Sequence, residues 1–275
     1  MAARAREEAF PLFPAKTGLP PVCTPEAFLD YMRRSGKRTA EPLPASAVMC
    51  YKSVLVSWVE KNQETGRVGG LPGGRIVGGD VVVCGGFGMG APAAVVLMEE
   101  LIARGVRRII SVGEAGSLDQ SAAPGDIVLC TKALRDEGTS HHYLPSERFA
   151  HPSGELTAEL CRVLDERQTP YIRGPSWTTD APYRETREEV AAYGARGILT
   201  VEMEAAALFA VGRYRGVQVA ALFSVSDSLA GGTWRPHFSD RRSREGLLEA
   251  LQAALQTALQ TAKGQISVKQ APEAD

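Results

Sequence analysis

The chain has 275 residues, in which 31 Lys and Arg residues face 32 Asp and Glu residues, so the formal net charge is −1. Hydrophobic residues make up 44% and charged residues 23%, a globular composition that excludes a collagen-like or wholly disordered chain. A net charge near zero provides no general attraction to nucleic acid, and the longest apolar runs are too short to span a bilayer.

The five cysteines are scattered along the chain, and no Cys-x-x-Cys pair occurs. An odd number of isolated cysteines argues against a disulfide framework or a zinc ribbon and predicts a reducing, cytoplasmic compartment. The charged N-terminus has no apolar segment behind it, so no signal peptide is expected. His141 and His142 are adjacent and therefore poorly placed to bind one ion, so we expect no metal site.

The sequence divides into three parts. Prolines recur through residues 1–45 and predict an irregular segment with one short helix over 25–34. Residues 46–263 carry alternating strand and helix patterns, which predict a single α/β domain. Residues 264–275 are polar and predict a flexible tail.

Strand and helix signals alternate within the predicted domain. Short β-branched runs bounded by glycine predict strands at 80–84, 107–112, 126–131, 198–201 and 218–225. Apolar spacing and helix-ending glycines predict helices at 91–104, 155–166, 184–193, 204–213 and 241–262. The leucine stripe of the last helix predicts packing in the core or against another subunit. The alternation implies βαβ units around a mainly parallel or mixed sheet, with ligands at the carboxyl ends of the strands.

A glycine-rich segment, residues 85–90, follows the first predicted strand and precedes a helix. Glycines there let backbone N–H groups approach an anion at a helix N-terminus. The spacing Gly86-x-Gly88-x-x-Ala91 also matches a dinucleotide-binding fingerprint, with Glu114 as the ribose ligand. A tight turn without a ligand is the alternative, and the acidic ends of the later strands argue against a complete dinucleotide fold.

Acidic residues follow two later strands. Glu202 and Glu204 flank Met203 where a strand meets a helix. A carboxylate there can accept both hydrogen bonds of a vicinal diol, and Met offers an apolar wall for a sugar; the alternative is a pair of helix-capping acids beside a core Met. Asp227 ends an apolar strand, where a partly desolvated carboxyl group suits the role of a general acid. An Asx turn or a helix cap would give the same pattern.

Two loops carry mixed polar and aromatic side chains. Residues 135–143 combine charges, hydroxyls and imidazoles. Residues 177–184 mix aromatic and polar groups in a way that suits a planar base, with a purely structural loop as the alternative.

Three motifs in combination resemble the nucleoside phosphorylase family, which contains uridine phosphorylase, hexameric purine nucleoside phosphorylase and the methylthioadenosine nucleosidases. They are Val201-Glu-Met-Glu-Ala205, Gly113-x-Ala-Gly116 with Gly125-Asp126 downstream, and Ser224-Val-Ser-Asp227. The loops Arg135-Asp-x-Gly-Thr-Ser-x-His142 and Thr178-Thr-Asp-Ala-Pro-Tyr-Arg184 are similar to the uridine-phosphorylase-like branch. The resemblance covers well over half of the chain. It implies one α/β domain with a mixed, partly barrel-closed central sheet flanked by helices, in a homodimer or a dimer-built trimer or hexamer.

The resemblance implies cleavage of the N-glycosidic bond of a nucleoside by phosphate, giving a free base and a pentose 1-phosphate. Phosphate would be the co-substrate, with no cofactor and no nucleic-acid or membrane partner. Glu204 would hold the 2′- and 3′-hydroxyls, Met203 would pack on the ribose and Glu202 would lie near the sugar or base. Asp227 would protonate the departing base. Other substrate contacts would come from Gly86, Phe87, Gly88, Gly113, Arg135, His142, Thr179, Tyr183 and Arg184.

Two departures from the family concern phosphate. The Gly-Asp-x-x-Arg phosphate loop is absent from the matching residues 48–53, where Lys52 is the one cation. Ser111 and Glu114 replace an Arg and a hydroxyl residue. Because a carboxylate repels phosphate, either Glu114 points elsewhere, or Lys52, Arg135 or a partner's Arg compensates, or water replaces phosphate with Glu114 as its base. A backbone hydrogen bond or an intersubunit ion pair is the structural alternative for Glu114.

Three functions therefore stay open: a phosphorylase, a nucleosidase that uses water, and a nucleoside-binding protein without turnover. Asp227 favours a purine, whose N7 can accept a proton, whereas the two loops resemble the pyrimidine branch without its Gln. Trp234 and Arg235 follow Asp227 and either cover the site as a lid or lie in a surface turn.

Overall fold

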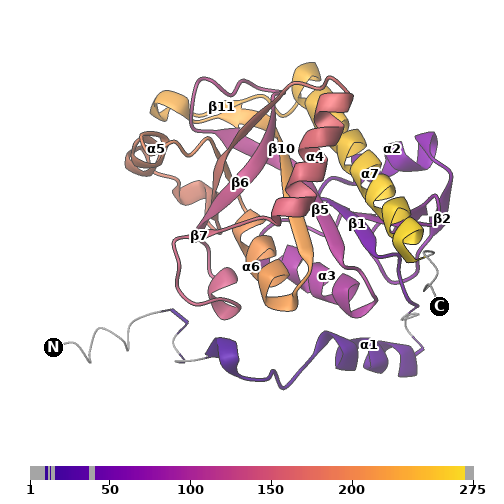
Figure 1. Cartoon of the computed structure of the whole chain (residues 1–275). Coiled ribbons are helices and arrows are strands. Elements are labelled where there is room, and N and C mark those ends of the chain that lie inside the picture. The colour runs from indigo at the N-terminus through magenta and orange to yellow at the C-terminus, as the bar shows by residue number, and fades with distance from the viewer. Residues whose placement is uncertain (1–9, 12, 14–15, 37–40, 270–275) are drawn as a thin grey trace.

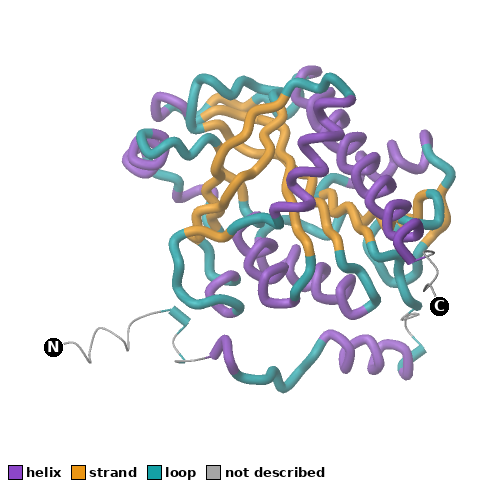
Figure 2. Tube along the Cα trace, in the orientation of Figure 1, coloured by secondary structure: helices purple, strands orange, loops and turns teal. Residues whose placement is uncertain are grey.

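A computed structural model describes residues 10–269 except 12, 14–15 and 37–40. A mixed sheet of eleven strands forms the centre, with helices on both of its faces (Figures 1 and 2). None of the helices in the described part of the chain is long and apolar enough to cross a membrane.

Four parallel strands form the middle of the sheet in the order β4 (Val81–Gly85), β1 (Ser46–Cys50), β5 (Arg108–Ser117) and β10 (Gln218–Ser228). Three further strands complete the main sheet: β6 (Ile127–Asp136), β8 (Tyr171–Thr179) and β9 (Thr200–Glu202). The remaining strands are short: β2 (Thr65–Arg67), β3 (Arg75–Val77), β7 (Phe149–Ala150) and β11 (Arg235–Pro236).

The sheet closes partly into a barrel. Strand β5 pairs with β10 and β9, β9 pairs with β8, β8 pairs with β6, and β6 returns to β10. The length of β5 and β10 makes this possible, because β5 pairs with the open sheet in its first half and with β9 at its end. The predicted mixed, partly barrel-closed sheet is confirmed.

Helices cover both faces of the sheet and enclose two cores. One core lies against α3 (Ala91–Ala103) and α6 (Ala205–Arg215), and the other against α2 (Ser53–Asn62), α4 (Gly154–Glu166) and α7 (Arg241–Lys269). On α7, Leu247, Leu251 and Leu255 are buried against the sheet. The predicted leucine stripe therefore packs in the core of its own chain. Helix α1 (Pro25–Arg34), which runs below α3 in Figure 1, lies outside these cores. Helix α5 (Arg187–Gly194) contributes Val190 to a third, smaller core that contains Trp177.

Strand β8 was predicted as a loop at its carboxyl end, and that prediction was wrong. Gly174 and Pro175 in its middle resemble a turn in the sequence. In the sheet they lie at an irregularity of the β6–β8 pairing, where Pro is tolerated. A Cβ on Gly174 would lie 2.1 Å from Leu199, so glycine is required by close packing. Trp177 is consequently buried, and its Nε1 donates to Asp136 Oδ2 at 2.9 Å.

Two other predicted boundaries differ from the structure. The helix predicted over 184–193 is a short turn, η4 (Pro182–Arg184), followed by α5. Thr186 begins α5 because its side chain and that of Glu189 form a reciprocal capping box. Helix α7 continues to Lys269, into the predicted tail, while residues 270–275 lie outside the described residues.

Candidate active site

The carboxyl ends of β1, β4, β5 and β10 meet at one edge of the sheet, as the parallel pairing requires. The segments that follow these strands, and the junction of β9 with α6, supply the predicted site residues. Contacts between these segments join them into one site.

The glycine-rich segment turns sharply from β4 into α3. Gly86, Gly88 and Gly90 have φ angles of +73°, +99° and +95°, a conformation that side-chain-bearing residues rarely adopt. The Gly90 N–H donates to Glu204 Oε1 at 2.5 Å, and a Cβ at Gly90 would lie 3.9 Å from Met203 Cε. The turn therefore lies directly against the predicted ribose-binding residues.

Glu204 is buried, with 7% of its surface exposed. Burial raises its pKa, and the negative charge of Glu202 raises it further, against the hydrogen bond from the Gly90 N–H. A hydrogen-bond donor that reaches this carboxylate, such as a sugar hydroxyl, would relieve the cost of burying its charge.

Glu202 is buried beside Glu204, and protein groups surround its carboxylate. One oxygen accepts from the Thr178 hydroxyl at 2.5 Å, and the other accepts from the backbone N–H groups of Glu204 and Ala205, both at 2.7 Å. These two N–H groups belong to the first turn of α6, whose backbone donors have no partner within the helix. The contacts of Glu202 correspond to the helix-capping alternative. Substrate binding by Glu202 stays a prediction.

Asp227 is buried at the end of β10, with 8% of its surface exposed. Its Oδ1 accepts from Ser226 Oγ at 2.8 Å, and its Oδ2 accepts from Trp234 Nε1 at 2.9 Å. A Cβ on Gly116 would lie 3.1 Å from Asp227 Oδ2, so glycine at this position admits the carboxylate. Trp234 thus reaches Asp227 although the residue is 60% exposed.

Glu185 is a second carboxyl group near Asp227 that the sequence analysis did not single out. Burial raises the pKa of Glu185 to about 7, with a further contribution from the charge of Asp227. The signal in the sequence was weak, because an acidic residue just before a helix is expected from capping alone.

Lys52 forms an ion pair with Glu114. The Lys52 Nζ lies 2.6 Å from Glu114 Oε1, and both side chains are partly buried. The preceding residue, Tyr51, bonds Ser111 Oγ at 3.0 Å, and its ring centroid lies 5.1 Å from that of Phe87. The segment after β1 therefore belongs to the site, although its strand carried no recognisable pattern in the sequence.

Gly113 also contacts this segment, since a Cβ there would lie 3.0 Å from the Tyr51 ring. The structure thus brings several predicted site residues to this edge of the sheet, namely Gly86, Phe87, Gly113, Glu114, Met203, Glu204 and Asp227. Among the described residues, no group of three or more His, Cys, Asp or Glu side chains could hold a metal ion.

Residues 57–262 match the family model described as the phosphorylase superfamily. The chain belongs to the phosphorylase superfamily. The matched range contains Glu114, Glu204 and Asp227, and it excludes Tyr51 and Lys52.

Relatives of this phosphorylase-superfamily chain include nucleoside phosphorylases. A guanosine phosphorylase of Halorubrum lacusprofundi is 33% identical over 163 residues, which cover 59% of this chain and 67% of that protein. Purine nucleoside and uridine phosphorylase relatives are matched over 58–62% of their own lengths.

Solved structures with the same fold include a uridine phosphorylase and a nucleosidase. The uridine phosphorylase of Vibrio fischeri ES114 superposes with a TM-score of 0.68 at 26% identity, over 79% of this chain and 93% of that chain. The AMP nucleosidase of Bacteroides thetaiotaomicron superposes with a TM-score of 0.69 over 89% of this chain and 100% of that chain. Its identity of 22% shows likeness of fold alone.

Arg135 and His142, two of the predicted substrate-binding residues, contact other protein groups in the structure. The guanidinium of Arg135 is buried and donates to Ser140 Oγ and to the backbone carbonyls of Leu144, Pro145 and Glu147. It thereby ties down the loop after β6. His142 Nδ1 lies 2.7 Å from Lys16 Nζ, beside the N-terminal segment.

The predicted base-binding residues lie around η4. Thr179 is buried at the end of β8, where its Oγ1 accepts from the Ala181 N–H at 3.2 Å. Tyr183 is 100% exposed, and Arg184 ends η4. Their role in base binding stays a prediction.

Proposed function

We propose that this chain is a nucleoside phosphorylase that cleaves a purine nucleoside with phosphate, giving the free base and a pentose 1-phosphate. The observation that carries the proposal is the placement of two buried carboxyl groups, Glu204 and Asp227, at one edge of the sheet in a chain of the phosphorylase superfamily. Its relatives that are named guanosine, purine nucleoside and uridine phosphorylases support the phosphorolytic reaction.

Glu204 and Met203 bind the ribose in this proposal. The carboxylate of Glu204 accepts hydrogen bonds from the 2′- and 3′-hydroxyls, and Met203, held against Gly90, packs on the apolar face of the sugar. Glu202 acts indirectly, because its hydrogen bonds to the first turn of α6 hold the backbone of Glu204 in place.

Asp227 acts as the general acid. As the C1′–N bond breaks, its electron pair passes to the base, Asp227 supplies a proton to that base, and a phosphate oxygen forms the new bond to C1′. The hydrogen bonds from Ser226 and Trp234 orient the carboxyl group for this transfer. Trp234 also lies where an aromatic ring could cover the base.

Glu185 favours a 6-oxopurine as the base. An ionised carboxylate accepts two hydrogen bonds, which suits the adjacent N1–H and 2-amino groups of guanine and leaves adenine without a matching donor at N1. The guanosine phosphorylase relative agrees with this choice.

The Glu185→Gln variant should therefore lose at least tenfold in kcat/KM for guanosine while adenosine changes little, because a site built to accept N–H donors discriminates strongly. For the unsubstituted protein, guanosine kcat/KM should rise as the pH increases through about 7, since ionisation of Glu185 creates the second acceptor. Steady-state kinetics across pH 5.5 to 8.5 would measure both. If the ratio of kcat/KM for guanosine to kcat/KM for adenosine is unchanged in Glu185→Gln, Glu185 does not take part in base recognition.

Lys52 is the proposed cation for phosphate, and its ion pair with Glu114 reduces the positive charge that it offers to the anion. Replacing Lys52 by Met should raise the KM for phosphate at least tenfold with little effect on the KM for nucleoside, because one charge-assisted hydrogen bond is lost. Replacing Glu114 by Gln should lower the KM for phosphate, since a negative charge is removed beside the anion. A rise in phosphate KM for Glu114→Gln would contradict this arrangement.

A nucleoside panel tests the reaction itself. Guanosine, inosine, adenosine and uridine are incubated with the purified protein, with and without phosphate, and the released base is measured. Release that requires phosphate supports the phosphorylase. Equal release without phosphate would replace it by a nucleosidase with Glu114 as the candidate base, and stabilisation by nucleoside without release would indicate a binding protein.

A further inference from the structure

A pocket lies at the edge of the sheet opposite the candidate active site. Its volume is about 550 Å³, and it is formed where β5 and β10 begin, between α4 and the C-terminal part of α7. Arg108 begins β5, opposite Ser46 of β1 and Gln218 of β10. At ~3.3 Å per strand residue, Arg108 lies roughly 25 Å along β5 from Gly116.

Arg108 is nine-tenths buried and lines this pocket, with 7% of its surface exposed. Its Nε donates to Ser46 Oγ at 3.0 Å. Among the residues that the structure describes, Arg108 makes no other side-chain hydrogen bond, and its terminal amino groups are not among the buried atoms that lack a partner, so they are open to the solvent in the pocket. The terminal N–H donors of Arg108 are therefore available to a ligand in the pocket.

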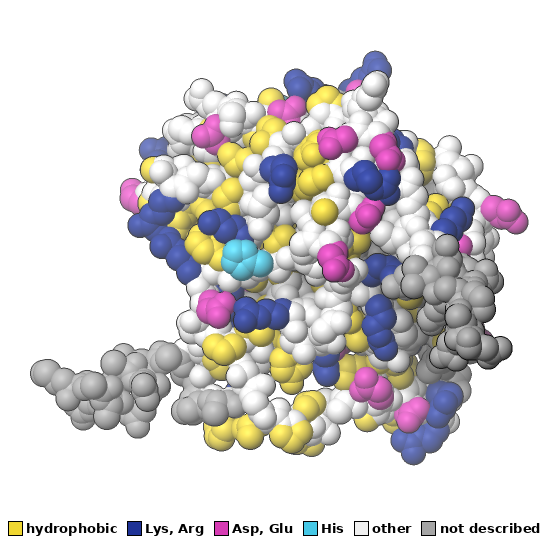
Figure 3. All heavy atoms as spheres, in the orientation of Figure 1, with side chains coloured by type: hydrophobic (Ala, Val, Ile, Leu, Met, Phe, Trp, Pro, Cys, Tyr) yellow, Lys and Arg dark blue, Asp and Glu magenta, His cyan; other side chains and the backbone are white. Residues whose placement is uncertain are grey.

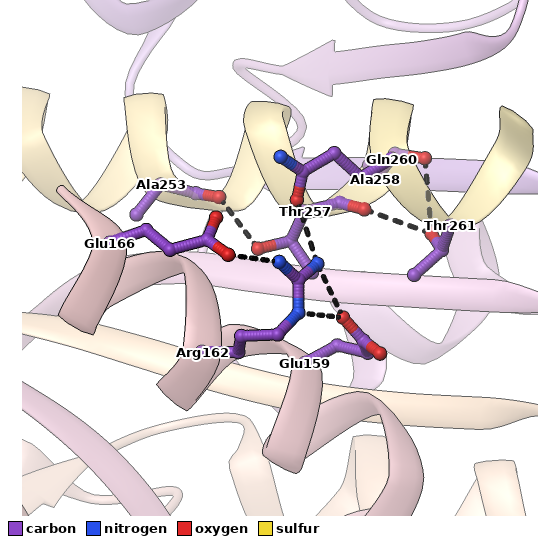
Figure 4. A network of polar contacts seen from close by, with 8 residues as sticks. All are labelled: Glu159, Arg162, Glu166, Ala253, Thr257, Ala258, Gln260 and Thr261. Carbon is purple, nitrogen blue, oxygen red and sulfur yellow. Dashed lines mark hydrogen bonds and ion pairs between the residues drawn. The ribbon is translucent and has the colours of Figure 1, made fainter. Parts of the chain in front are cut away.

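The neighbouring acidic side chains are engaged elsewhere. Arg162 on α4 binds both Glu159 and Glu166, and it also donates to Gln260 of α7 (Figure 4). The Glu155 carboxylate accepts from Gln218 Nε2 at 2.7 Å. Burial lowers the pKa of Arg108, and no carboxylate opposes that shift. Basic and acidic side chains are interspersed on the face that α4 and α7 form (Figure 3).

The chemistry of the lining indicates what this pocket accepts. A guanidinium presents two parallel N–H donors that match a carboxylate or phosphate group bidentately. The lining also includes Glu155, Gln218, Gln260 and Thr261, which can accept from or donate to hydroxyl and N–H groups. A volume of about 550 Å³ suits a small metabolite rather than a single inorganic ion.

We propose that this pocket is a second ligand site, which binds a small anionic metabolite through a phosphate or carboxylate group held by Arg108. Hydroxyl or N–H groups on the rest of the metabolite donate to Glu155. The site is separate from the one proposed for catalysis and does not depend on the reaction that the chain performs.

Isothermal titration calorimetry with the full chain tests the proposal. Ribose 5-phosphate and succinate serve as the phosphate and carboxylate probes, and inorganic phosphate tests whether the anion suffices. The same titrations are made with Arg108→Gln and with Arg108→Lys, which keeps the positive charge but loses the paired N–H donors of the guanidinium. Arg107→Gln, at the adjacent exposed residue, is the matched control. Circular dichroism checks that each variant is folded.

We expect at least one probe to bind, and we expect Arg108→Gln to weaken that binding at least tenfold. Arg108→Lys should weaken it less, and Arg107→Gln should leave it unchanged. The probe that binds more tightly identifies the anionic group. The proposal is overturned if no probe binds at millimolar concentration, or if a probe binds with the same affinity to Arg108→Gln. Should Arg108→Gln fail to fold, equal affinity in Arg108→Lys overturns it.

Discussion

The Asp227→Asn variant is expected to release purine bases 10²- to 10⁴-fold more slowly than the unsubstituted protein, which is the range that a positioned general acid supplies. Asn keeps the shape of the side chain and can still form hydrogen bonds with Ser226 and Trp234. The decrease in rate therefore measures the effect of removing the proton that Asp227 donates. Base release from inosine and guanosine under saturating phosphate measures it.

A leaving group that needs no proton separates this role from a structural one. A nitrophenyl riboside should be cleaved by Asp227→Asn nearly as fast as by the unsubstituted protein. Trp234→Phe is the matched control, because it removes one hydrogen bond to Asp227 and keeps an aromatic ring and the acid. Equal slowing of the purine nucleoside and the nitrophenyl substrate would show that Asp227 is not the acid.

Replacing Glu204 by Gln should lower kcat/KM for every nucleoside at least tenfold. The amide offers one acceptor oxygen where the carboxylate offers two for the ribose hydroxyls. With 2′-deoxynucleosides the difference between the two proteins should shrink, because one of the hydroxyls is missing. A loss of equal size with ribose and deoxyribose substrates would contradict sugar binding by Glu204.

The same substitution should change how stability depends on pH. Burial and the charge of Glu202 raise the pKa of Glu204 above its ordinary value of 4.5, so the folded protein holds this proton more tightly than the unfolded chain. Stability contributed by the protonated form is complete below the ordinary pKa and is lost as the pH rises through the folded pKa. Glu204→Gln cannot ionise, so its melting temperature should exceed that of the unsubstituted protein by a margin that grows from pH 5 to pH 8.

Glu202→Gln is the matched control for Glu204→Gln, since it lies two residues away and is equally buried. Its carboxylate accepts two backbone N–H groups of α6, so an amide there should lower the melting temperature across the same pH range. If Glu202→Gln and Glu204→Gln have the same effect on stability, the two acids do not differ as their contacts indicate.

The sequence predicted five strands of the sheet and most of the helices because their signals are local. The run before Gly85 contains consecutive β-branched residues, and the helix after Gly90 has apolar residues at helical spacing ended by a glycine. Strand β8 was missed for the opposite reason. Its Gly174 and Pro175 have the local pattern of a turn, and only the packing of Leu199 and the irregular pairing with β6 make them part of a strand.

The residues of the candidate site also differ in whether their positions could be predicted from the sequence. Glu204, Met203 and Asp227 follow strands and lie within motifs, so their positions at the carboxyl edge of the sheet followed from the order of the elements. The partner of Glu114 could not be predicted. Lys52 is separated from it by sixty-two positions, and the ion pair forms because β1 and β5 are neighbours in the sheet.

By itself, the sequence determined the α/β class, the alternation of five strands with most of the helices, and the acidic residues that follow the strands, because these depend on spacing and residue type. Only the tertiary structure decided which acid faces which partner. It placed the carboxylate of Glu202 against the first turn of α6 and that of Glu204 against the Gly90 N–H, and it left the terminal donors of Arg108 open to a pocket. The reason is physical: burial, hydrogen bonding and charge compensation depend on neighbours that the chain brings together from distant positions.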